Sequence, residues 1–501
     1  MHAVRLGLSS GYPSAFRSAA RASRARRFLA RIDGCATHDI AEPSPGRTRH
    51  VAMASSRDAS ETSGGTPPRV AVVGAGISGL TAASHLARGG CAVTVYETGR
   101  GPGGRTSTRR AGPDGAGWQF DHGAQYFAAK DPAFRAIVED WRAEGLVAEW
   151  TGVFGTLDAT TGTFVREDGS ETKERWVGTP SMNAVAKGLA RRPGISLVTS
   201  RRVTSFEGGP GVGDGSWTVV HRSSAPTAKS DDPGAKTDPV PAEPPRRDAR
   251  FVAVVAADKQ TASDRSVRVY GEDPPLLSLD SPAVWKGMRA SGQTPSFALM
   301  LAVKNGRKSG AGADDEDGAK MNAEKTRLFE FQGATVEGDD VVAWIADDSS
   351  KPGRRTGAPD ADVTCWVVQS TPAYAARRVK ATATLLEPSG TLLNEVAEEM
   401  TDALLRLAAK SAKRRGEGSV EASNIEIAHV AAHRWGAAFP DDGAAAAAAA
   451  SGMGCLADAE RRVVGCGDFC VSPKIEGAAL SGAAAAARVV EMIAETPAAS
   501  L

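Results

Sequence analysis

The sequence is poor in cysteine, with six residues among 501, and these are scattered from Cys35 to Cys470. Small secreted domains that depend on disulfides carry far more, so a disulfide framework is excluded and a reducing compartment is expected. The sequence has no HExxH or CxxC motif, and Cys466 and Cys470 stand four positions apart. It therefore predicts neither a metal site nor a dithiol site.

Net charge and long apolar runs are also lacking. Sixty Lys and Arg against 59 Asp and Glu leave a charge of +1, which excludes a general attraction to nucleic acid or to acidic membrane surfaces. No apolar run approaches the roughly 20 residues that cross a bilayer, so we expect no membrane span. The expected partners are small molecules, and the sequence leaves the oligomeric state open.

The N-terminal 32 residues are rich in arginine and have no acidic residue before Asp33. Such a composition is typical of an organelle transit peptide, whereas a secretory signal needs an apolar core that arginines interrupt here. We expect residues 1–54 to be a disordered transit peptide, removed near VAMASS at 51–56. A basic tail that is retained is the alternative.

Regular structure is first predicted at residues 69–97, RVAVVGAGISGLTAASHLARGGCAVTVYE. An apolar run, a glycine turn, a helical pattern over about 77–89 and a second apolar run predict a βαβ unit. Gly74 permits the sharp turn, Gly76 lets the main chain approach a pyrophosphate, and Gly79 lets helix and strand pack. This GxGxxG pattern, in this context, predicts dinucleotide binding.

The same unit supplies the polar groups that a dinucleotide needs. The helix N-terminus offers amides and a partial positive charge to phosphates, over Gly74, Ala75, Gly76, Ile77, Ser78 and Gly79. Glu97 ends the second strand, 18 residues after Gly79, and can accept hydrogen bonds from an adenosine ribose.

A second glycine pair follows in TGRGPGGRTST, residues 98–108. Gly103 and Gly104 again allow close backbone approach, and Arg105 can lie along anionic oxygens with two nitrogens. A surface turn with a solvated arginine is the alternative.

This continuation resembles that of amine oxidase and renalase flavoproteins, and the chain from 69 to 495 resembles the renalase-type FAD oxidoreductases, including cyanobacterial and plastid relatives. The motifs that carry the resemblance are VAVVGAGISGL, RGPGGRTSTRR, FDHGAQYF (120–127), WVGTPSMNAVAKGLA (176–190), WIADDSSKPGR (344–354), TCWVVQSTPAYA (364–375), AHRW (432–435) and GDFCVSPKIEGAALSG (467–482). The resemblance implies FAD as the cofactor and oxidation of misreduced dihydronicotinamide isomers, with hydride passing to the flavin and then to dioxygen. It also favours the chloroplast over the mitochondrion.

The resemblance implies further cofactor contacts. RVVGCGD reads as a strand that ends at Gly467 and Asp468, the sheet edge where doubly wound folds bind ligands, so Asp468 would bond a ribityl hydroxyl or flank the pyrophosphate. A helix expected to start at about Gly477, with Ala478, would point its amides at the flavin, or would merely pack on the sheet. The backbone of Val203 would meet the adenine.

The predicted fold class is α/β, with a Rossmann-like FAD-binding domain interleaved with an antiparallel-sheet α+β substrate domain. The FAD-binding parts are expected at 69–127, 176–263 and 460–496, and the substrate-domain parts at 128–175 and 280–440. Polar, low-complexity stretches at 223–249 and 305–325 predict disordered insertions, the first inside a hairpin of 216–222 with 251–258.

Several aromatic and polar residues are candidates for the substrate site. His122 either contacts flavin or substrate or ties a turn together with Asp121. Trp344, Trp366 and Trp435 lie on or beside expected strands, where they either sandwich a planar ring or fill the core. Of these we favour Trp435 with Arg434, because renalase-type proteins carry a similar run. Residues 349–351, SSK, either bind a substrate phosphate or carboxylate or form a solvated turn.

No catalytic side chain is assigned beyond the site-lining candidates His122, Arg434 and Trp435, because a flavin takes the hydride itself and the protein mainly positions and shields. The sequence has no second strand-linked GxGxxG, so a nicotinamide would bind as a substrate in the flavin cleft. Two alternatives remain open: a flavin amine oxidase or desaturase acting on an amine or isoprenoid, and a flavin-stabilised binding protein without turnover.

Overall fold

The computed structural model describes residues 66–112, 117–168, 173–224, 243–304, 328–354, 363–381, 390–416, 425–441 and 452–495. The expected transit peptide, the expected insertion at 305–325 and most of the one at 223–249 lie outside the described residues. Contacts group the chain from Pro67 onward as one unit.

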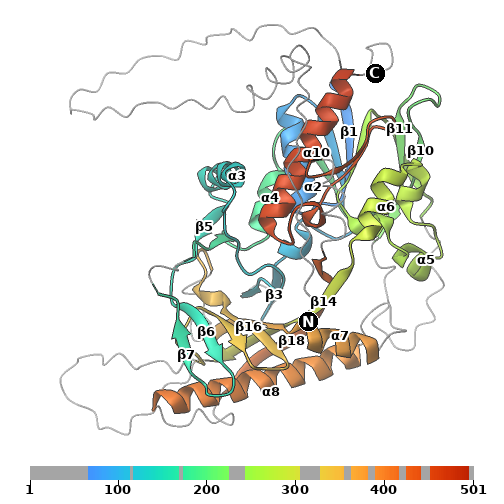
Figure 1. Cartoon of the computed structure of the whole chain (residues 1–501). Coiled ribbons are helices and arrows are strands. Elements are labelled where there is room, and N and C mark those ends of the chain that lie inside the picture. The colour runs from blue at the N-terminus through green and yellow to red at the C-terminus, as the bar shows by residue number, and fades with distance from the viewer. Residues whose placement is uncertain are drawn as a thin grey trace, which may run out of the picture. The chain divides into compact units, whose positions relative to one another are not determined.

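The N-terminal βαβ unit forms as the sequence predicts. It consists of β1 (Arg69–Val73), α2 (Ile77–Arg88) and β2 (Ala92–Tyr96), and β1 and β2 are parallel. They lie in a six-stranded sheet of order β19-β20-β13-β1-β2-β9. Figure 1 shows β1 and α2 in the upper part of the view. The other strands come from distant parts of the chain: β9 (Ile195–Val198), β13 (Ala253–Ala256), β19 (Leu456–Asp458) and β20 (Val463–Gly465). All pairs are parallel except β19–β20.

Helices cover this sheet, and α10 (Ile475–Glu495) packs directly against α2. A Cβ on Gly482 would lie 2.2 Å from the Ser78 carbonyl oxygen, so the glycine permits this close approach. Within the described residues, α10 is the one helix long and apolar enough to cross a membrane by length and composition, although 44% of its apolar window is buried. The absence of a membrane span therefore stays a prediction. Nearby helices are α3 (Pro132–Ala143) and α4 (Ala184–Ala190).

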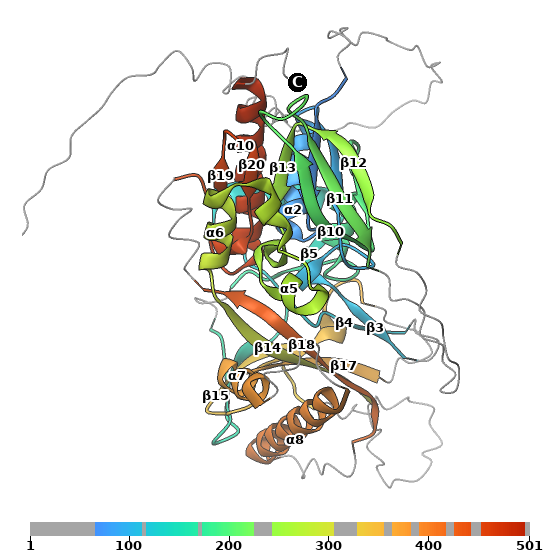
Figure 2. The same cartoon turned by 90° about the vertical axis from the view of Figure 1, so that its right-hand side faces the viewer.

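A three-stranded antiparallel sheet lies beside the first sheet (Figure 2). Its strands are β10 (Arg201–Gly208), β11 (Trp217–Ser223) and β12 (Arg246–Phe251). Of the hairpin expected between 216–222 and 251–258, only Phe251 pairs as predicted, because β11 pairs with the charged strand β12 while β13 crosses into the six-stranded sheet. Helices α5 (Arg265–Tyr270) and α6 (Pro282–Ala290) follow.

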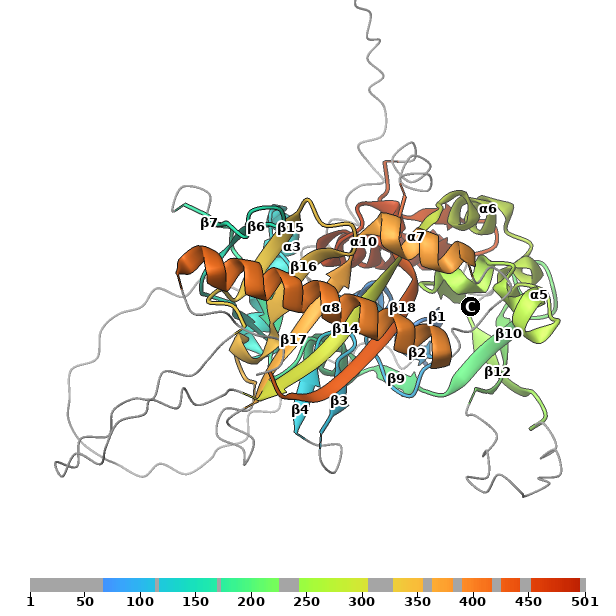
Figure 3. The ribbon, with the colours of Figure 1, turned by 90° about the horizontal axis from the view of Figure 1, so that it is seen from below.

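The second large sheet has seven strands in the order β18-β14-β17-β16-β15-β6-β7. These are β6 (Phe154–Asp158), β7 (Phe164–Arg166), β14 (Gln293–Lys304), β15 (Gly333–Glu337), β16 (Val342–Asp347), β17 (Val363–Ser370) and β18 (Ile427–Pro440). Only the β15–β6 pair in this sheet, among the described residues, is parallel. Figure 3 shows the long helix α8 (Gly390–Arg415) running across one face, with α7 (Pro372–Ala381) beside it.

Two small sheets each consist of two antiparallel strands. They are β3 (Arg109–Ala111) with β4 (Trp118–Phe120), and β5 (Val147–Glu149) with β8 (Trp176–Gly178). The predicted fold class, a parallel Rossmann-like sheet with a largely antiparallel second sheet, is confirmed.

The two faces of the seven-stranded sheet differ, as the twofold alternation of strands requires. Phe297, Leu299 and Trp366 face α8 and are at most 1% exposed. Met300 and Val367 point the other way and pack on Phe120 of β4. We call these the outer face, toward α8, and the inner face, toward residues 120–127.

Candidate active site

The first glycine loop has the geometry that a dinucleotide needs. Gly74 adopts a φ of +104°, and a Cβ on Gly79 would lie 2.0 Å from the Gly74 carbonyl oxygen. Gly76 differs, because a Cβ there would meet nothing within 4 Å. Gly76 is also the N-cap of α2, and no side chain caps that helix. Open space before uncapped helix amides fits a bound pyrophosphate.

Glu97 fixes this loop from the end of β2. Its Oε2 accepts a hydrogen bond from the Ala75 amide at 2.9 Å, and its Oε1 accepts one from the Gly99 amide at 2.6 Å. Burial raises the pKa of Glu97, and these two hydrogen bonds oppose the rise. Each carboxylate oxygen has a second lone pair, so Glu97 can hold the loop and still accept from a ribose hydroxyl.

Asp258 is a loop neighbour that sequence reasoning missed. It follows β13, and a Cβ on Gly74 would lie 2.9 Å from the Asp258 Cβ. Burial raises the pKa of Asp258, while the Gln260 amide donates to it at 2.9 Å. An acid directly after a buried strand, in FVAVVAAD, was the available signal.

The second glycine loop lies against the first. The Gly103 amide donates to the Ala75 carbonyl at 2.9 Å, and a Cβ on Gly104 would lie 3.8 Å from the Gly76 Cα. Gly103 and Gly104 both have positive φ, +132° and +53°. The sharp turn therefore needs glycine at both positions.

Arg105 and Asp468, both predicted to touch the cofactor, contact each other. Arg105 Nη1 donates to Asp468 Oδ2 at 2.7 Å and Nη2 donates to Oδ1 at 2.6 Å, although the residues are 363 positions apart. The pair brings the second loop to the carboxyl end of β20. Asp468 is buried and Arg105 is 42% exposed, so the guanidinium keeps an open side. Contact of either residue with a cofactor stays a prediction.

The terminal glycines have local packing reasons. Helix α10 begins at Ile475, and a Cβ on Gly477 would lie 2.2 Å from the Ser472 carbonyl oxygen. A Cβ on Gly467 would lie 2.2 Å from the Phe469 ring. The Ala478 amide donates to the Lys474 carbonyl at 3.0 Å, in the first turn of α10. These contacts explain the glycines without a ligand, so their cofactor role stays a prediction.

Val203 lies on β10, which begins at Arg201. The Arg201 amide donates to the Glu97 carbonyl at 3.0 Å, which places the start of β10 beside the end of β2. The Val203 side chain is 3% exposed and packs with Tyr96 in one apolar cluster. Its predicted contact is through the backbone, which this packing leaves untested.

Four residues form a row across the inner face of the seven-stranded sheet. The strand register aligns His433 of β18, Ala298 of β14, Gln369 of β17 and Trp344 of β16. Ala298 is buried, and the other three are half-buried. We call these four residues the inner-face row.

Residues 121–126 contact both ends and the middle of this row. The His122 ring lies 4.7 Å from the His433 ring, and the Tyr126 ring lies 5.5 Å from Trp344. Between them, Gln369 Nε2 donates to the Gly123 carbonyl at 2.7 Å. The Ala124 amide donates to the Arg105 carbonyl at 2.9 Å. Residues 121–126 thus connect the second glycine loop with the inner-face row.

His122, His433 and Trp435 form one aromatic cluster. His122 stacks on Trp435 at 5.1 Å and 28°, and Trp435 Nε1 donates to the His122 carbonyl at 2.8 Å. Burial, with His433 and Arg109 nearby, lowers the pKa of His122 to about 3. Burial, with Arg109 and Arg434, lowers the pKa of His433 to about 4. Both rings are therefore neutral at pH 7.

Of the three predicted site-lining residues, the structure brings His122 and Trp435 together and places Arg434 apart from them. His122 and Trp435 come together, and His433, which sequence reasoning passed over, joins them. Arg434 is in register with Phe297, an outer-face residue, so its role in lining the site stays a prediction. The alternation of HRW along a strand was the signal for His433.

The three candidate tryptophans also divide. Trp366 is 1% exposed and packs edge-on against Phe329 at 5.6 Å on the outer face. Trp344 and Trp435 are half-buried beside residues 122–126. Trp366 is therefore a core residue, and Trp344 and Trp435 are the available aromatic walls.

The loop 349–351 does not offer a free anion site. Lys351 has a fully buried side chain that contacts Asp121 and Asp348. Ser350 Oγ accepts from Trp150 Nε1 at 3.0 Å. Lys351 is therefore neither solvated nor free for a substrate anion. Ser349 and Ser350 are half-buried, and their part in substrate binding stays a prediction.

The described cysteines are buried thiols. They are Cys91, Cys365, Cys455, Cys466 and Cys470. Burial raises the pKa of each, to about 11 for Cys91 and about 12 for Cys470, so none is a thiolate at neutral pH. Within the described residues no three His, Cys, Asp or Glu side chains gather as metal ligands do.

Residues 72–141 match the family described as the NAD(P)-binding Rossmann-like domain. The chain carries a Rossmann-like dinucleotide-binding domain. This span contains α2, β2, Glu97 and both glycine loops. Over 52 residues the chain is 54% identical to hydroxyneurosporene desaturase of Cereibacter sphaeroides, a match that covers 10% of each protein.

One solved structure extends the likeness to most of the chain. Cyclohexylamine oxidase from Brevibacterium oxydans matches with a TM-score of 0.53 and 13% identity, covering 86% of this chain and all of that one. Putrescine oxidase bound to putrescine matches with a TM-score of 0.48 and 14% identity, over 85% and 99% of the two chains. The chain therefore has the fold of the cyclohexylamine oxidase, with both the Rossmann-like domain and the second sheet.

Proposed function

We propose that the protein is an FAD-dependent oxidoreductase in which a dihydronicotinamide, an aberrant isomer of NAD(P)H, gives a hydride to the flavin. With one further proton, the two electrons then reduce dioxygen to hydrogen peroxide. The observation that carries this proposal is the inner-face row. It places half-buried aromatic and neutral side chains against residues 121–126, which a hydrogen bond from the Ala124 amide to the Arg105 carbonyl links to the second glycine loop.

The cofactor is held by this chain's own loops. The amides at the start of α2, beside the open space at Gly76, would bind the pyrophosphate. Glu97 would bind the ribose, and the open side of Arg105 would meet phosphate oxygens. Bound FAD supplies a two-electron acceptor, which the protein's side chains do not offer.

The substrate side suits a flat ring without positive charge. Trp344 and Trp435 can contact a planar ring by their faces. His122 and His433 are neutral at pH 7, because burial and cations including Arg109 lower the pKa of each. The positive charge of Arg109 favours a substrate that carries phosphates and disfavours a substrate that carries an ammonium group.

A flavin amine oxidase or desaturase is the second candidate. The fold of cyclohexylamine oxidase and the local identity with hydroxyneurosporene desaturase support it. A binding protein without turnover is the third candidate, and it requires a flavin that no donor reduces.

Anaerobic absorption spectra of the full chain test the proposal. Isomerised NADPH, ordinary NADPH and cyclohexylamine are added separately to equal samples. We expect the flavin band to bleach fastest with the isomers. Bleaching by the amine alone would support the second candidate, and no bleaching by any donor would support the third.

Organelle import is proposed from residues 1–54, with the chloroplast as the destination. A fluorescent fusion with and without these residues tests it. Equal distribution of both fusions would contradict it.

A further inference from the structure

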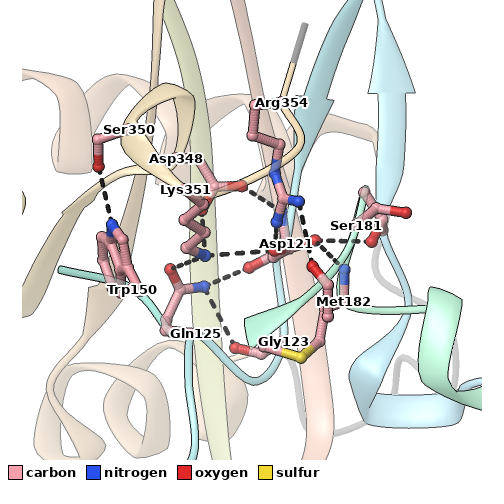
Figure 4. A network of polar contacts seen from close by, with 12 residues as sticks. Asp121, Gly123, Gln125, Trp150, Ser181, Met182, Asp348, Ser350, Lys351 and Arg354 are labelled. Atoms are coloured by element: carbon pink, nitrogen blue, oxygen red, sulfur yellow. Dashed lines mark hydrogen bonds and ion pairs between the residues drawn. The ribbon is translucent and has the colours of Figure 1, made fainter. Parts of the chain in front are cut away.

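Four charged side chains are buried together where residues 120–125 meet the loop after β16 (Figure 4). They are Asp121, Asp348, Lys351 and Arg354, and none is more than 7% exposed. Two carboxylates face two cations, so the group is balanced in charge. We call these four residues with Gln125 the buried network.

Lys351 lies at the centre of the buried network. Its Nζ donates to Asp121 Oδ2 at 3.3 Å and to Gln125 Oε1 at 3.4 Å, and it forms an ion pair with Asp348. Asp348 Oδ2 in turn accepts from the Asp121 amide at 2.6 Å. One lysine therefore ties the loop after β16 to two positions of residues 121–125.

Arg354 and Asp121 extend the network to a third segment. Arg354 forms an ion pair with Asp121 and donates to the Pro180 carbonyl at 2.5 Å. Asp121 Oδ1 accepts from Met182 N at 3.1 Å and from Thr108 Oγ1 at 2.6 Å. The network thus joins the loop after β16 to Thr108 and to residues 180–182, which are far apart in the sequence.

Stability alone does not explain such a group, since burying charges is costly and an apolar replacement of the whole set is often as stable. Burial works to raise the pKa of Asp121, but Lys351 and Arg354 hold it below the ordinary value. Burial raises the pKa of Asp348, against the attraction of Lys351. The two carboxylates depend on both cations, whose attraction opposes the effect of burial on their pKa. The buried network as a whole therefore fixes the position of residues 121–125.

What the network holds in place is the segment that reaches the site. Gln125 Nε2 donates to the carbonyls of Asp121 and Gly123, and Gly123 also accepts from Gln369 of the inner-face row. His122, between them, stacks on Trp435. A shift of residues 121–125 would therefore move His122 relative to Trp435 and to the second glycine loop.

We propose that Lys351 is a positioning residue, which acts with Asp348 and Gln125 to hold residues 121–125 between the cofactor loops and the inner-face row. The role rests on the proposed function, because the reaction positioned is flavin reduction. Lys351 itself touches neither the inner-face row nor the glycine loops in any contact described above.

Two variants and one control test this role in the full chain. Lys351→Met with Asp348→Asn removes one cation and one anion, so the network stays balanced, and the amide oxygen of the new asparagine can still accept from the Asp121 amide. Gln125→Met changes no net charge and removes the hydrogen bonds of Gln125 with Lys351 and with the carbonyls of Asp121 and Gly123. The control is Tyr374→Phe, in which the buried Tyr374 on the outer face loses a partly buried hydrogen bond to Glu399.

Hydrogen exchange of the peptide 121–127, measured without cofactor, is the first readout. We expect exchange about tenfold faster or more in both test variants and unchanged exchange in the control. The limiting rate of flavin reduction by isomerised NADPH is the second. We expect this limiting rate to fall by about tenfold to 100-fold in both test variants, because a 1 Å misplacement of reacting groups can cost about 100-fold. The dissociation constant of the donor should change by less than about threefold, because Lys351 does not contact the donor in this account.

A purely structural role would lower the melting temperature of all three variants and leave exchange at 121–127 and the limiting rate as in the control. That result would overturn the proposal. If wild-type protein is not reduced by the isomers, the proposed function fails, and exchange alone then decides whether the network positions this segment.

Discussion

The two faces of the seven-stranded sheet use the same strands for different purposes. On the outer face, Phe297, Leu301 and Trp366 are at most 1% exposed and pack toward α8. On the inner face, Gln369 and Trp344 remain half-buried beside residues 121–126. Both faces carry large aromatic residues, but Trp366 of the outer face is buried whereas Trp344 of the inner face is partly exposed. Partial exposure of aromatic side chains, and not their presence, therefore marks the candidate site.

The largest effect is expected for Trp366→Ala on the outer face. Removing a fully buried indole leaves a cavity between Phe329 and Phe331, so the free energy of unfolding should fall by about 3–5 kcal/mol. Urea unfolding of the full chain measures it. A loss below about 1 kcal/mol would contradict a core role for this residue.

Trp344→Ala on the inner face should weaken donor binding more than it lowers the free energy of unfolding. Loss of one aromatic wall should raise the dissociation constant for the dihydronicotinamide isomers about tenfold, or about 1.4 kcal/mol. The loss of unfolding free energy should be smaller than for Trp366→Ala. Rapid-mixing reduction at several donor concentrations measures the constant, and an unchanged constant would exclude Trp344 from the site.

Acid should destabilise the inner face through its neutral histidines. The pKa of His433 is lowered from 6.5 to about 4, so between these values the unfolded chain binds more protons than the folded one. Stability conferred by neutral His433 is then present above about pH 6.5 and is lost as the pH falls toward 4. The slope is at most about 1.4 kcal/mol per pH unit for each histidine.

His433→Gln should reduce this acid loss, because glutamine does not titrate. Urea unfolding at pH 7 and at pH 5 gives the difference for each protein. An equal difference in wild type and variant would show that the pKa of His433 is the same in the folded and unfolded protein, against the account.

The smallest effect is expected at a strand end away from both faces. Lys304 pairs with Glu426, and the two side chains are 51% and 66% exposed. Lys304→Ala should change the free energy of unfolding by less than about 1 kcal/mol. A larger change would contradict the view that the effect of a substitution in this sheet follows the burial of the side chain.

Local patterns made the cofactor domain predictable. The glycine loop, α2 and β2 follow from spacing within 30 residues, and the structure has them at the expected positions. The strand β12 was missed, because RRDARF is charged and its partner strand lies across a stretch of polar sequence. Alternation predicts strands well and predicts charged edge strands poorly.

Long-range contacts were not predictable from one sequence. Lys351 meets Asp121 across 230 positions, and Arg105 meets Asp468 across 363. Trp344 and Trp366 lie on opposite faces of the sheet. The sequence does not show this, because it depends on the register between β16 and β17. A shift of one residue in register would exchange the two faces.

Hydroxyl-radical footprinting of the full chain tests the central claim, that the inner face meets the ligands and the outer face holds the fold. Oxidation of Trp344, Trp366 and Trp435 is measured by mass spectrometry without ligand and with FAD plus NADP⁺. We expect Trp344 and Trp435 to be oxidised without ligand and protected with it, while Trp366 stays unmodified in both. Unchanged oxidation of Trp344 and Trp435 on adding the ligands would contradict the account.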